Sequence, residues 1–212
     1  MRSLSTARLP ALAALLLSAA PAAAQEPPAV DAFAQAMAAR QVADFARRQK
    51  DVRAMLTAAA MLREIPTQDQ PGAEPGGFGA AALFAEARAM AGGDARVRAE
   101  VDFAEKAARS RGVVASAFGK GLVRSVRVVD PRGAYRFTVT AAGGTPLRVG
   151  AIGDVGTALA MRVQDGAGRT LCLDDNADYA PVCQLTPKTA GQYRIDILNK
   201  SGARSRAVIL SN

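Results

Sequence analysis

The hydrophobic pattern of this chain changes its period once, near residue 121 of 212. In residues 29–112 apolar side chains recur every three or four positions among strong helix formers, which is typical of amphipathic helices. In residues 121–212 apolar and polar side chains alternate, which is typical of strands with one buried face. The fold class predicted from this change is α+β, with a small N-terminal α-helical domain followed by an antiparallel β-sandwich.

The helical half is predicted to contain two helical hairpins. Asp31, Asp51 and Asp94 stand where helix N-caps are expected, and Pro66 ends the second helix. Residues 66–79 are rich in Pro, Gly and Gln and are predicted to be a loop. The expected apolar faces are Phe33, Met37, Val42 and Phe45 in the first helix, and Val97, Val101, Phe103 and Ala107 or Ala108 in the fourth.

The second hairpin, from Leu83 to Ala108, loosely resembles a tetratricopeptide unit, with small Ala residues and a Gly-Gly-Asp turn. A solenoid of such units needs about three repeats to be stable. Because only two hairpins are predicted, a helical bundle packed on the second half is the favoured interpretation. A partner-binding groove is the alternative.

The second half is predicted to contain eight short strands separated by turn signals rich in Gly, Asp and Pro. Such regular spacing indicates an antiparallel sandwich. The strands are expected near residues 122–129, 134–141, 146–152, 158–164, 169–173, 181–186, 192–198 and 204–211.

Residues 1–24 are predicted to be a secretory signal peptide. Arg2 and Arg8 give a positive start, an apolar run follows, and Ala22 to Ala24 supply small residues before the cleavage site. The apolar run is shorter than the ~20 residues that a transmembrane helix needs. We therefore expect a periplasmic or secreted protein with no transmembrane segment after signal removal. The helical domain is expected over residues 25–112, a linker over 113–120 and the sandwich over 121–212.

The chain has two cysteines, Cys172 and Cys183, and they bracket an acidic turn between two predicted strands. Export places them in an oxidising compartment, where a disulfide is favoured over two free thiols. We expect a bridge between neighbouring strands, with the two Cα atoms within about 7 Å.

Between the cysteines, Asp174, Asn176 and Asp178 stand at alternate positions, a spacing with which many calcium loops begin. The complete motif also needs a following Gly and a later bidentate Glu, and Tyr179 stands where the Gly is needed. A solvated acidic turn that binds calcium weakly or not at all is therefore the favoured interpretation. Calcium is the single candidate cofactor, and otherwise none is expected.

The net charge of +8 is unevenly distributed. Residues 113–212 hold 13 basic and 7 acidic side chains, whereas residues 25–112 are balanced at 12 of each. An ordinary solvated surface is favoured over a binding surface on charge alone. If an anionic partner exists, Arg136, Arg162 and Arg194 are its candidate ligands, because each alternates with buried residues and should point to solvent.

The order of motifs in residues 121–212 resembles the bacterial pre-peptidase C-terminal domain, a jelly-roll-like β-sandwich. The resemblance is carried by Val155 to Asp165, by Gly168 to Asp175 and by the Thr-Gly-Tyr segment within Thr186 to Ile197. It implies an accessory module for folding, secretion or substrate attachment. Family members often carry aspartates where this chain has Ala158 and Ala160, which weakens what the resemblance implies about calcium or substrate binding.

The absence of histidine excludes Ser-His and Cys-His catalysis in their usual forms. We therefore expect no enzyme but an exported binding or scaffolding module of the cell envelope. Its partner would be a protein or an anionic envelope component, and no nucleic acid is expected. The alternative function is an envelope hydrolase that uses carboxylates of the 174–178 turn. A pocket that brings a second carboxylate close to Asp174 or Asp178 would favour the hydrolase.

Overall fold

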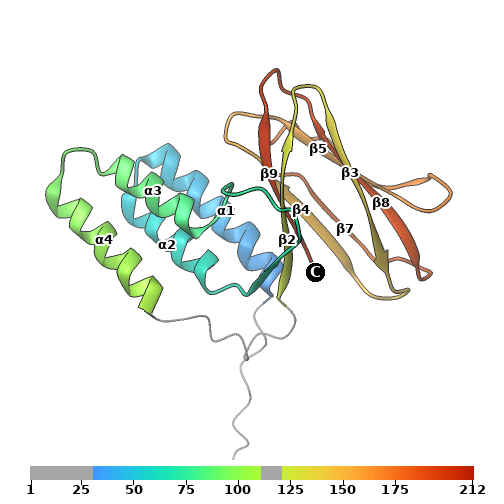
Figure 1. The fold of residues 1–212 in the computed structure, drawn as a ribbon, viewed down its shortest axis with the longest axis horizontal. Helices are drawn as coiled ribbons and strands as arrows, with labels where there is room; N and C mark the ends of the chain where they lie inside the picture. The colour runs from blue at the N-terminus through green and yellow to red at the C-terminus, as the bar shows by residue number, and fades with distance from the viewer. Residues whose placement is uncertain (1–30, 111–120) are drawn as a thin grey trace, which may run out of the picture.

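The computed structural model describes residues 31–110 and 121–212, so the predicted signal peptide and linker lie outside the described residues. Helices α1 to α4 lie on one side of two packed β-sheets, which confirms the α+β class (Figure 1). The helices are α1 (Ala32–Gln49), α2 (Val52–Arg63), α3 (Ala80–Met90) and α4 (Ala95–Ser110). The strands are β1 (Thr67–Asp69), β2 (Leu122–Val129), β3 (Ala134–Ala141), β4 (Leu147–Ile152), β5 (Leu159–Gln164), β6 (Thr170–Asp174), β7 (Val182–Leu185), β8 (Gly191–Asn199) and β9 (Ser205–Ser211).

The helices begin where the sequence predicts. Asp31 caps α1 by accepting hydrogen bonds from the backbone N–H groups of the first turn, both at 3.1 Å. Asp51 and Asp94 cap α2 and α4 in the same way. Each carboxylate satisfies N–H groups that have no partner within the helix, and this fixes where the helix starts.

The buried face of α1 differs from the predicted one. Apart from Phe33, its buried residues are all alanines. Phe45 is 48% exposed, so the expectation that it lies on the buried face is wrong. Phe103 of α4 is likewise 75% exposed, while Val101 is fully buried. Alanine allows neighbouring helices to approach closely, so the larger side chains are not needed between them. The buried alanines of α1 are Ala36, Ala39, Ala43 and Ala46.

The β-sandwich consists of a five-stranded sheet in the order β1-β2-β9-β4-β7 and a four-stranded sheet in the order β3-β8-β5-β6. Its eight main strands match the predicted ranges to within one or two residues at each end, and every pairing among them is antiparallel. From β2 to β9, consecutive strands alternate between the sheets except at β5 and β6, which both belong to the four-stranded sheet. This arrangement is that of an eight-stranded jelly roll.

Strand β1 lies in the segment that the sequence predicts to be a loop. Thr67–Asp69 pairs in parallel with the start of β2, and its three side chains are all exposed. A strand that buries no side chain has no alternating pattern, which is why the prediction missed it. The rest of the segment continues along β2, where Glu74 N–H donates to Val126 O at 3.0 Å.

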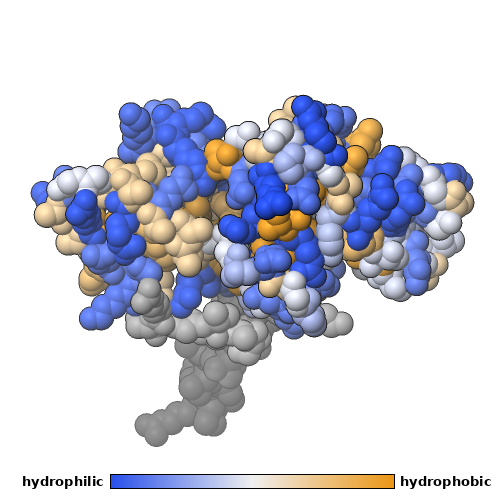
Figure 2. All heavy atoms as spheres, turned by 45° about the horizontal axis from the view of Figure 1, so that its top comes forward, coloured by the Kyte–Doolittle hydropathy of each residue, from blue (hydrophilic) through white to orange (hydrophobic). Residues whose placement is uncertain are grey.

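The helices and the sandwich share a hydrophobic cluster at their junction. Phe33 and Ala36 of α1 pack with Val126 of β2 and Val208 of β9. The outward side of the five-stranded sheet is therefore covered by the helical part, whereas the four-stranded sheet faces away from it (Figure 1). Figure 2 shows hydrophobic residues along this junction, with hydrophilic patches over the sandwich. The division into two domains at residues 113–120 stays a prediction.

Within the described ranges 31–110 and 121–212, none of the helices combines the length and the apolar character that crossing a membrane requires.

Candidate anion-binding site

The three arginines singled out from the sequence lie on one sheet. Arg136 is in β3, Arg162 in β5 and Arg194 in β8, and these strands are neighbours in the four-stranded sheet. Their inward neighbours in sequence pack in the sandwich core, so all three point to the outward face, the one turned away from the helices. We call this set the arginine platform.

A carboxylate that the prediction did not include lies at the centre of the platform. Asp196 of β8 pairs directly with Arg136 on one side and with Arg162 on the other. It is 1% exposed although it lies on the outward face, because the guanidinium groups cover it. Buried charges are usually paired, and here one carboxylate is surrounded by three cations.

The three guanidinium groups do not share Asp196 equally. Arg162 donates twice to Asp196 Oδ2, from Nε at 3.1 Å and from Nη2 at 2.6 Å. The Nε atoms of Arg136 and Arg194 approach Oδ1 at 3.3 and 3.4 Å. Neither approach has hydrogen-bond geometry, so Oδ1 is buried without a hydrogen bond. Arg162 is therefore the main partner of Asp196, and the other two arginines are held near it by charge.

This arrangement leaves hydrogen-bond donors available to a ligand. Arg136 is 66% exposed and makes no hydrogen bond to any described residue, while Arg194 is 50% exposed and donates to Gln164 Oε1. A guanidinium carries five N–H donors in a planar fork that fits phosphate and carboxylate oxygens. With three positive charges and one negative charge, the platform has a local excess of two positive charges.

The surface beside the platform also contains apolar side chains. Leu173 of β6 lies directly opposite Arg162 and is 60% exposed, and Leu171 on the same strand is 43% exposed. Thr138 lies opposite Arg194. The outward face of this sheet thus places cations next to hydroxyl and apolar groups.

Sequence reasoning found the arginines because alternation gives the face of each side chain, but it did not identify Asp196 as their common partner. Which strands are neighbours decides this, and alternation carries no information about neighbours. The one available signal was that Asp196 stands two positions from Arg194 and therefore shares its face.

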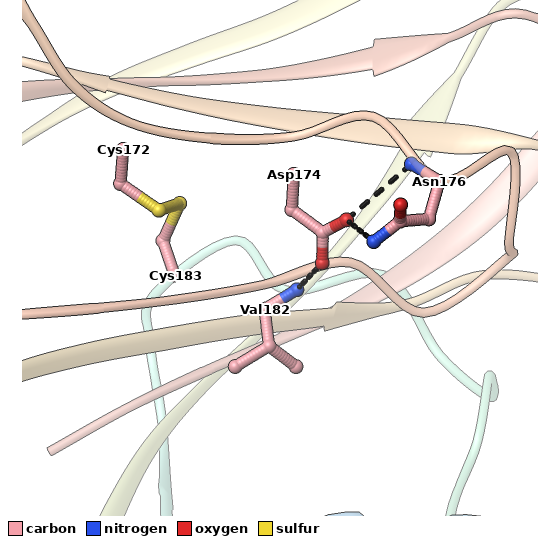
Figure 3. Close-up of a disulfide and its surroundings, with 5 residues drawn as sticks. All are labelled: Cys172, Asp174, Asn176, Val182 and Cys183. Carbon is pink, nitrogen blue, oxygen red and sulfur yellow. Dashed lines mark hydrogen bonds between the residues drawn. A yellow bond between two sulfur atoms is a disulfide. The ribbon is translucent and has the colours of Figure 1, made fainter.

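The predicted disulfide is confirmed. Cys172 and Cys183 are bonded, and their Cα atoms are 5.9 Å apart (Figure 3). The expected geometry differs in one respect, because β6 and β7 are consecutive strands that belong to different sheets. The bond therefore joins the two sheets along one edge of the sandwich rather than two strands of one sheet.

The carboxylates of the acidic turn are occupied by protein donors. Asp174 Oδ1 accepts from the Asn176 side chain at 2.8 Å, and its Oδ2 accepts from Val182 N–H at 2.8 Å (Figure 3). Asp178 accepts from Tyr179 N–H at 2.6 Å and from the guanidinium of Arg40. Across the described residues, no group of three or more His, Cys, Asp or Glu side chains is arranged to hold a metal ion. Calcium binding by Asp174, Asn176 and Asp178 stays a prediction.

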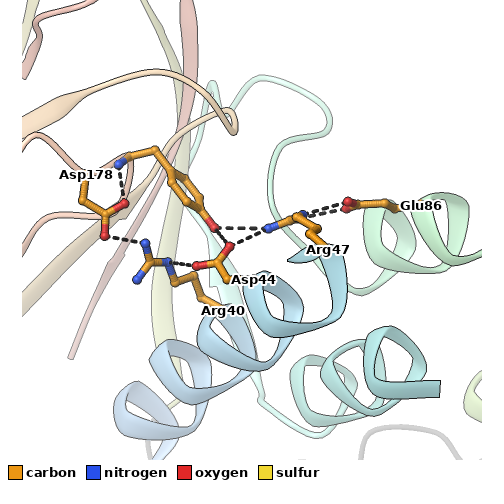
Figure 4. A network of polar contacts seen from close by, with 6 residues as sticks. Arg40, Asp44, Arg47, Glu86 and Asp178 are labelled. Atoms are coloured by element: carbon orange, nitrogen blue, oxygen red, sulfur yellow. Dashed lines mark hydrogen bonds and ion pairs between the residues drawn. The ribbon is translucent and has the colours of Figure 1, made fainter. Parts of the chain in front are cut away.

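The acidic turn has a second role, which is to hold the helices against the sandwich. Tyr179 extends to α1, where its hydroxyl donates to Asp44 Oδ1 and accepts from Arg47 Nη1 at 3.1 Å. Arg40 pairs with both Asp44 and Asp178 (Figure 4), and its guanidinium lies 4.7 Å from the centre of the Tyr179 ring. Arg47 also forms a two-hydrogen-bond pair with Glu86 of α3, at 2.7 and 2.8 Å.

This network shifts the ionisation of its members. Burial raises the pKa of Tyr179 to about 12, and the hydrogen bond to Asp44 adds to the effect. Burial opposes the charge on Arg47, but its pair with Glu86 outweighs burial and raises the pKa of the guanidinium. The tyrosine is therefore neutral and the arginines are charged at neutral pH, as the contacts require.

No protein-family model and no curated protein matches this chain. Solved structures that are similar to it include the pre-peptidase C-terminal domain of a collagenase from Bacillus anthracis. The TM-score is 0.34 and the identity 9%, over 41% of this chain and 86% of that one. The family that residues 121–212 resemble is thus among the similar structures, whereas the tetratricopeptide resemblance of the helices has no support.

Two further similar structures have other described roles. The Aeromonas hydrophila PliG, a periplasmic inhibitor of g-type lysozyme, has a TM-score of 0.34 and 12% identity, over 44% of this chain and 87% of that one. A carbohydrate-binding module of Cellvibrio mixtus lichenase 5A, in complex with cellotriose, has a TM-score of 0.28 and 10% identity, over 40% of this chain and 72% of that one. Each similarity covers less than half of this chain.

Proposed function

We propose that the protein is an exported, non-catalytic binding module of the cell envelope, and that its arginine platform binds an anionic envelope component. The observation that carries this proposal is the gathering of Arg136, Arg162 and Arg194 around Asp196 on a sheet face that no described helix covers. The disulfide is consistent with a periplasmic or secreted location, because such bonds persist in oxidising compartments.

The shared carboxylate supports binding because it orients the arginines in advance. A free arginine side chain loses considerable conformational entropy when it binds a ligand. Asp196 accepts two hydrogen bonds from Arg162 and attracts Arg136 and Arg194 by charge, and Gln164 accepts from one Nη group of Arg194. The guanidinium groups are thus positioned beforehand, while most of their N–H donors remain free for phosphate or carboxylate oxygens.

The hydrolase alternative gains no support from the geometry. Asp44 lies near Asp178, but both carboxylates are paired with Arg40, whose guanidinium lies between them. Asp174 accepts hydrogen bonds from Asn176 and Val182 instead. A carboxylate mechanism needs two carboxyl groups facing one substrate. We therefore carry only the binding function forward.

The experiment compares binding to anionic phospholipid vesicles and to an acidic polysaccharide as the salt concentration is raised. Replacing Arg136, Arg162 and Arg194 together by Gln should weaken binding by about tenfold or more, since a hydrogen bond to a charged group is worth about 1.5–3 kcal/mol. Because this change leaves Asp196 buried without a cationic partner, binding is compared only where circular dichroism shows the variant to be folded. Parent binding should also weaken with salt, since exposed charges are screened beyond ~10 Å at 0.1 M.

The matched control replaces three exposed arginines that lie outside the platform, Arg53, Arg169 and Arg204, by Gln. Each is at least 74% exposed and pairs with one carboxylate. Because both variants replace three arginines by Gln, their net charge changes by the same amount. Binding should survive this change. Equal losses in both triple variants would show that net charge alone governs binding, and salt-insensitive binding would also contradict the proposal.

A further inference from the structure

A cavity of about 650 Å³ lies where the helices meet the five-stranded sheet, on the opposite side of the sandwich from the arginine platform. We call it the junction cavity. Small-molecule sites typically have volumes of ~300–1,000 Å³ and mostly apolar walls with a few polar groups. The apolar wall includes Leu62, Ile65, Phe78, Leu122, Val208 and Leu210.

One wall of the junction cavity is formed by a loop that only glycine permits. Gly76 and Gly77 have φ angles of +84° and +76°, a region that other residues rarely adopt. A Cβ atom on Gly77 would lie 2.5 Å from Val208 Cγ2, so the backbone rests directly against β9. Arg124 Nη2 also donates to Gly76 O at 3.0 Å. The wall is thus fixed in place without a ligand.

The charged groups around the cavity leave one cation without an acidic partner. Arg124 is neutralised by Asp69, with Nη1 and Oδ1 2.9 Å apart. Arg63, at the end of α2, donates from Nε and Nη2 only to the carbonyl of Ala108, at 3.2 and 3.0 Å. No carboxylate pairs with Arg63 in the described part of the chain, and its Nη1 group makes no hydrogen bond to a described residue.

We propose that the junction cavity binds a small amphipathic anion, whose apolar chain lies against the aliphatic wall and whose carboxylate pairs with Arg63. An apolar cavity with one uncompensated guanidinium at its edge complements a ligand with an apolar body and one negative charge. This proposal is independent of the arginine platform, because the two sites share no residue.

The test is calorimetric titration of the full mature chain with decanoate, and with decanol as the uncharged probe. Decanoate should bind with a stoichiometry of one and should raise the melting temperature. Arg63→Gln should weaken decanoate binding about tenfold or more and leave decanol binding unchanged. Decanol should bind the parent more weakly than decanoate, by a similar factor.

Two further variants keep the test decisive. Ala81 lines the cavity at the exposed start of α3, so Ala81→Phe should block entry of both probes without disturbing the fold. Ala89→Phe changes an exposed alanine of the same helix outside the cavity and should bind like the parent. The triple Gln variant of the platform should also retain decanoate binding. The proposal would be overturned if decanoate did not bind the parent, or if Arg63→Gln bound decanoate as tightly as the parent. It would also be overturned if the folded platform variant, rather than Arg63→Gln, lost decanoate binding.

Discussion

At the scale of single residues, the decisive interactions involve charged side chains whose partners lie far away in sequence. Asp196 is buried on an outward face because Arg136 and Arg162 from the neighbouring strands cover it together with Arg194 of its own strand. Tyr179 is bonded to Asp44, 135 positions earlier. Residue type and spacing gave the face of each side chain, but not these pairings, because a pairing depends on how the elements are arranged.

Tyr179 provides a prediction about pH. Its pKa is raised to about 12 in the folded protein, whereas a tyrosine in the unfolded chain titrates near 10. The neutral phenol therefore stabilises the fold fully below about pH 10, and this contribution is lost as the pH rises toward 12. Tyr179→Phe should lower the free energy of unfolding by about 1–3 kcal/mol at pH 7–9. Urea unfolding should show that the difference in unfolding free energy between the parent and the variant decreases by an amount on the order of 2 kcal/mol between pH 10 and 12. A gap that stays constant over that range would contradict the assignment.

At the scale of elements, the eight main strands and the starts of the helices were predictable because each is determined locally. Alternation marks a half-buried strand, and a carboxylate before an apolar run marks a helix start. The alanine face of α1 was not predictable from the large apolar residues, since packing against α2 selected small ones. Strand β1 was missed because it buries none of its three side chains, so its pairing with β2 leaves no alternating pattern in the sequence.

The contact between α1 and β4 gives a prediction at this scale. Gly150 lies on β4 beneath α1, and a Cβ atom there would be 3.2 Å from Phe33 Cζ and 3.3 Å from the Met37 methyl group. Gly150→Val should therefore overpack the junction and lower the free energy of unfolding by about 1–3 kcal/mol in urea. Gly202→Val is the control, because a Cβ atom at that turn meets nothing within 4 Å. Equal stability of the two variants would show that α1 does not press on β4.

At the scale of the whole molecule, the helices and the sandwich are joined in two ways. The hydrophobic cluster at the junction contains residues of α1, β2, β4 and β9, and the network around Tyr179 links α1 and α3 to the acidic turn. That turn is itself held by the disulfide between the two sheets. Loss of the disulfide should therefore also lower the stability of the helices, although neither cysteine lies in a helix.

Replacing Cys172 and Cys183 by Ser tests this connection. Opening a loop of this length should lower stability by about 2–3 kcal/mol, since the unfolded chain regains conformational freedom. For a protein of this size the melting temperature should fall by roughly 5–10 °C. The far-ultraviolet circular dichroism signal reports on the helices, and the near-ultraviolet signal reports on the tyrosines, which all lie in the sandwich half. Because the acidic turn anchors α1, we expect both signals to be lost in the same thermal transition. If the tyrosine signal moved and the helical signal stayed at the parent temperature, the helices would be an independent folding unit, and the boundary at residues 113–120 would separate two domains in the thermodynamic sense as well.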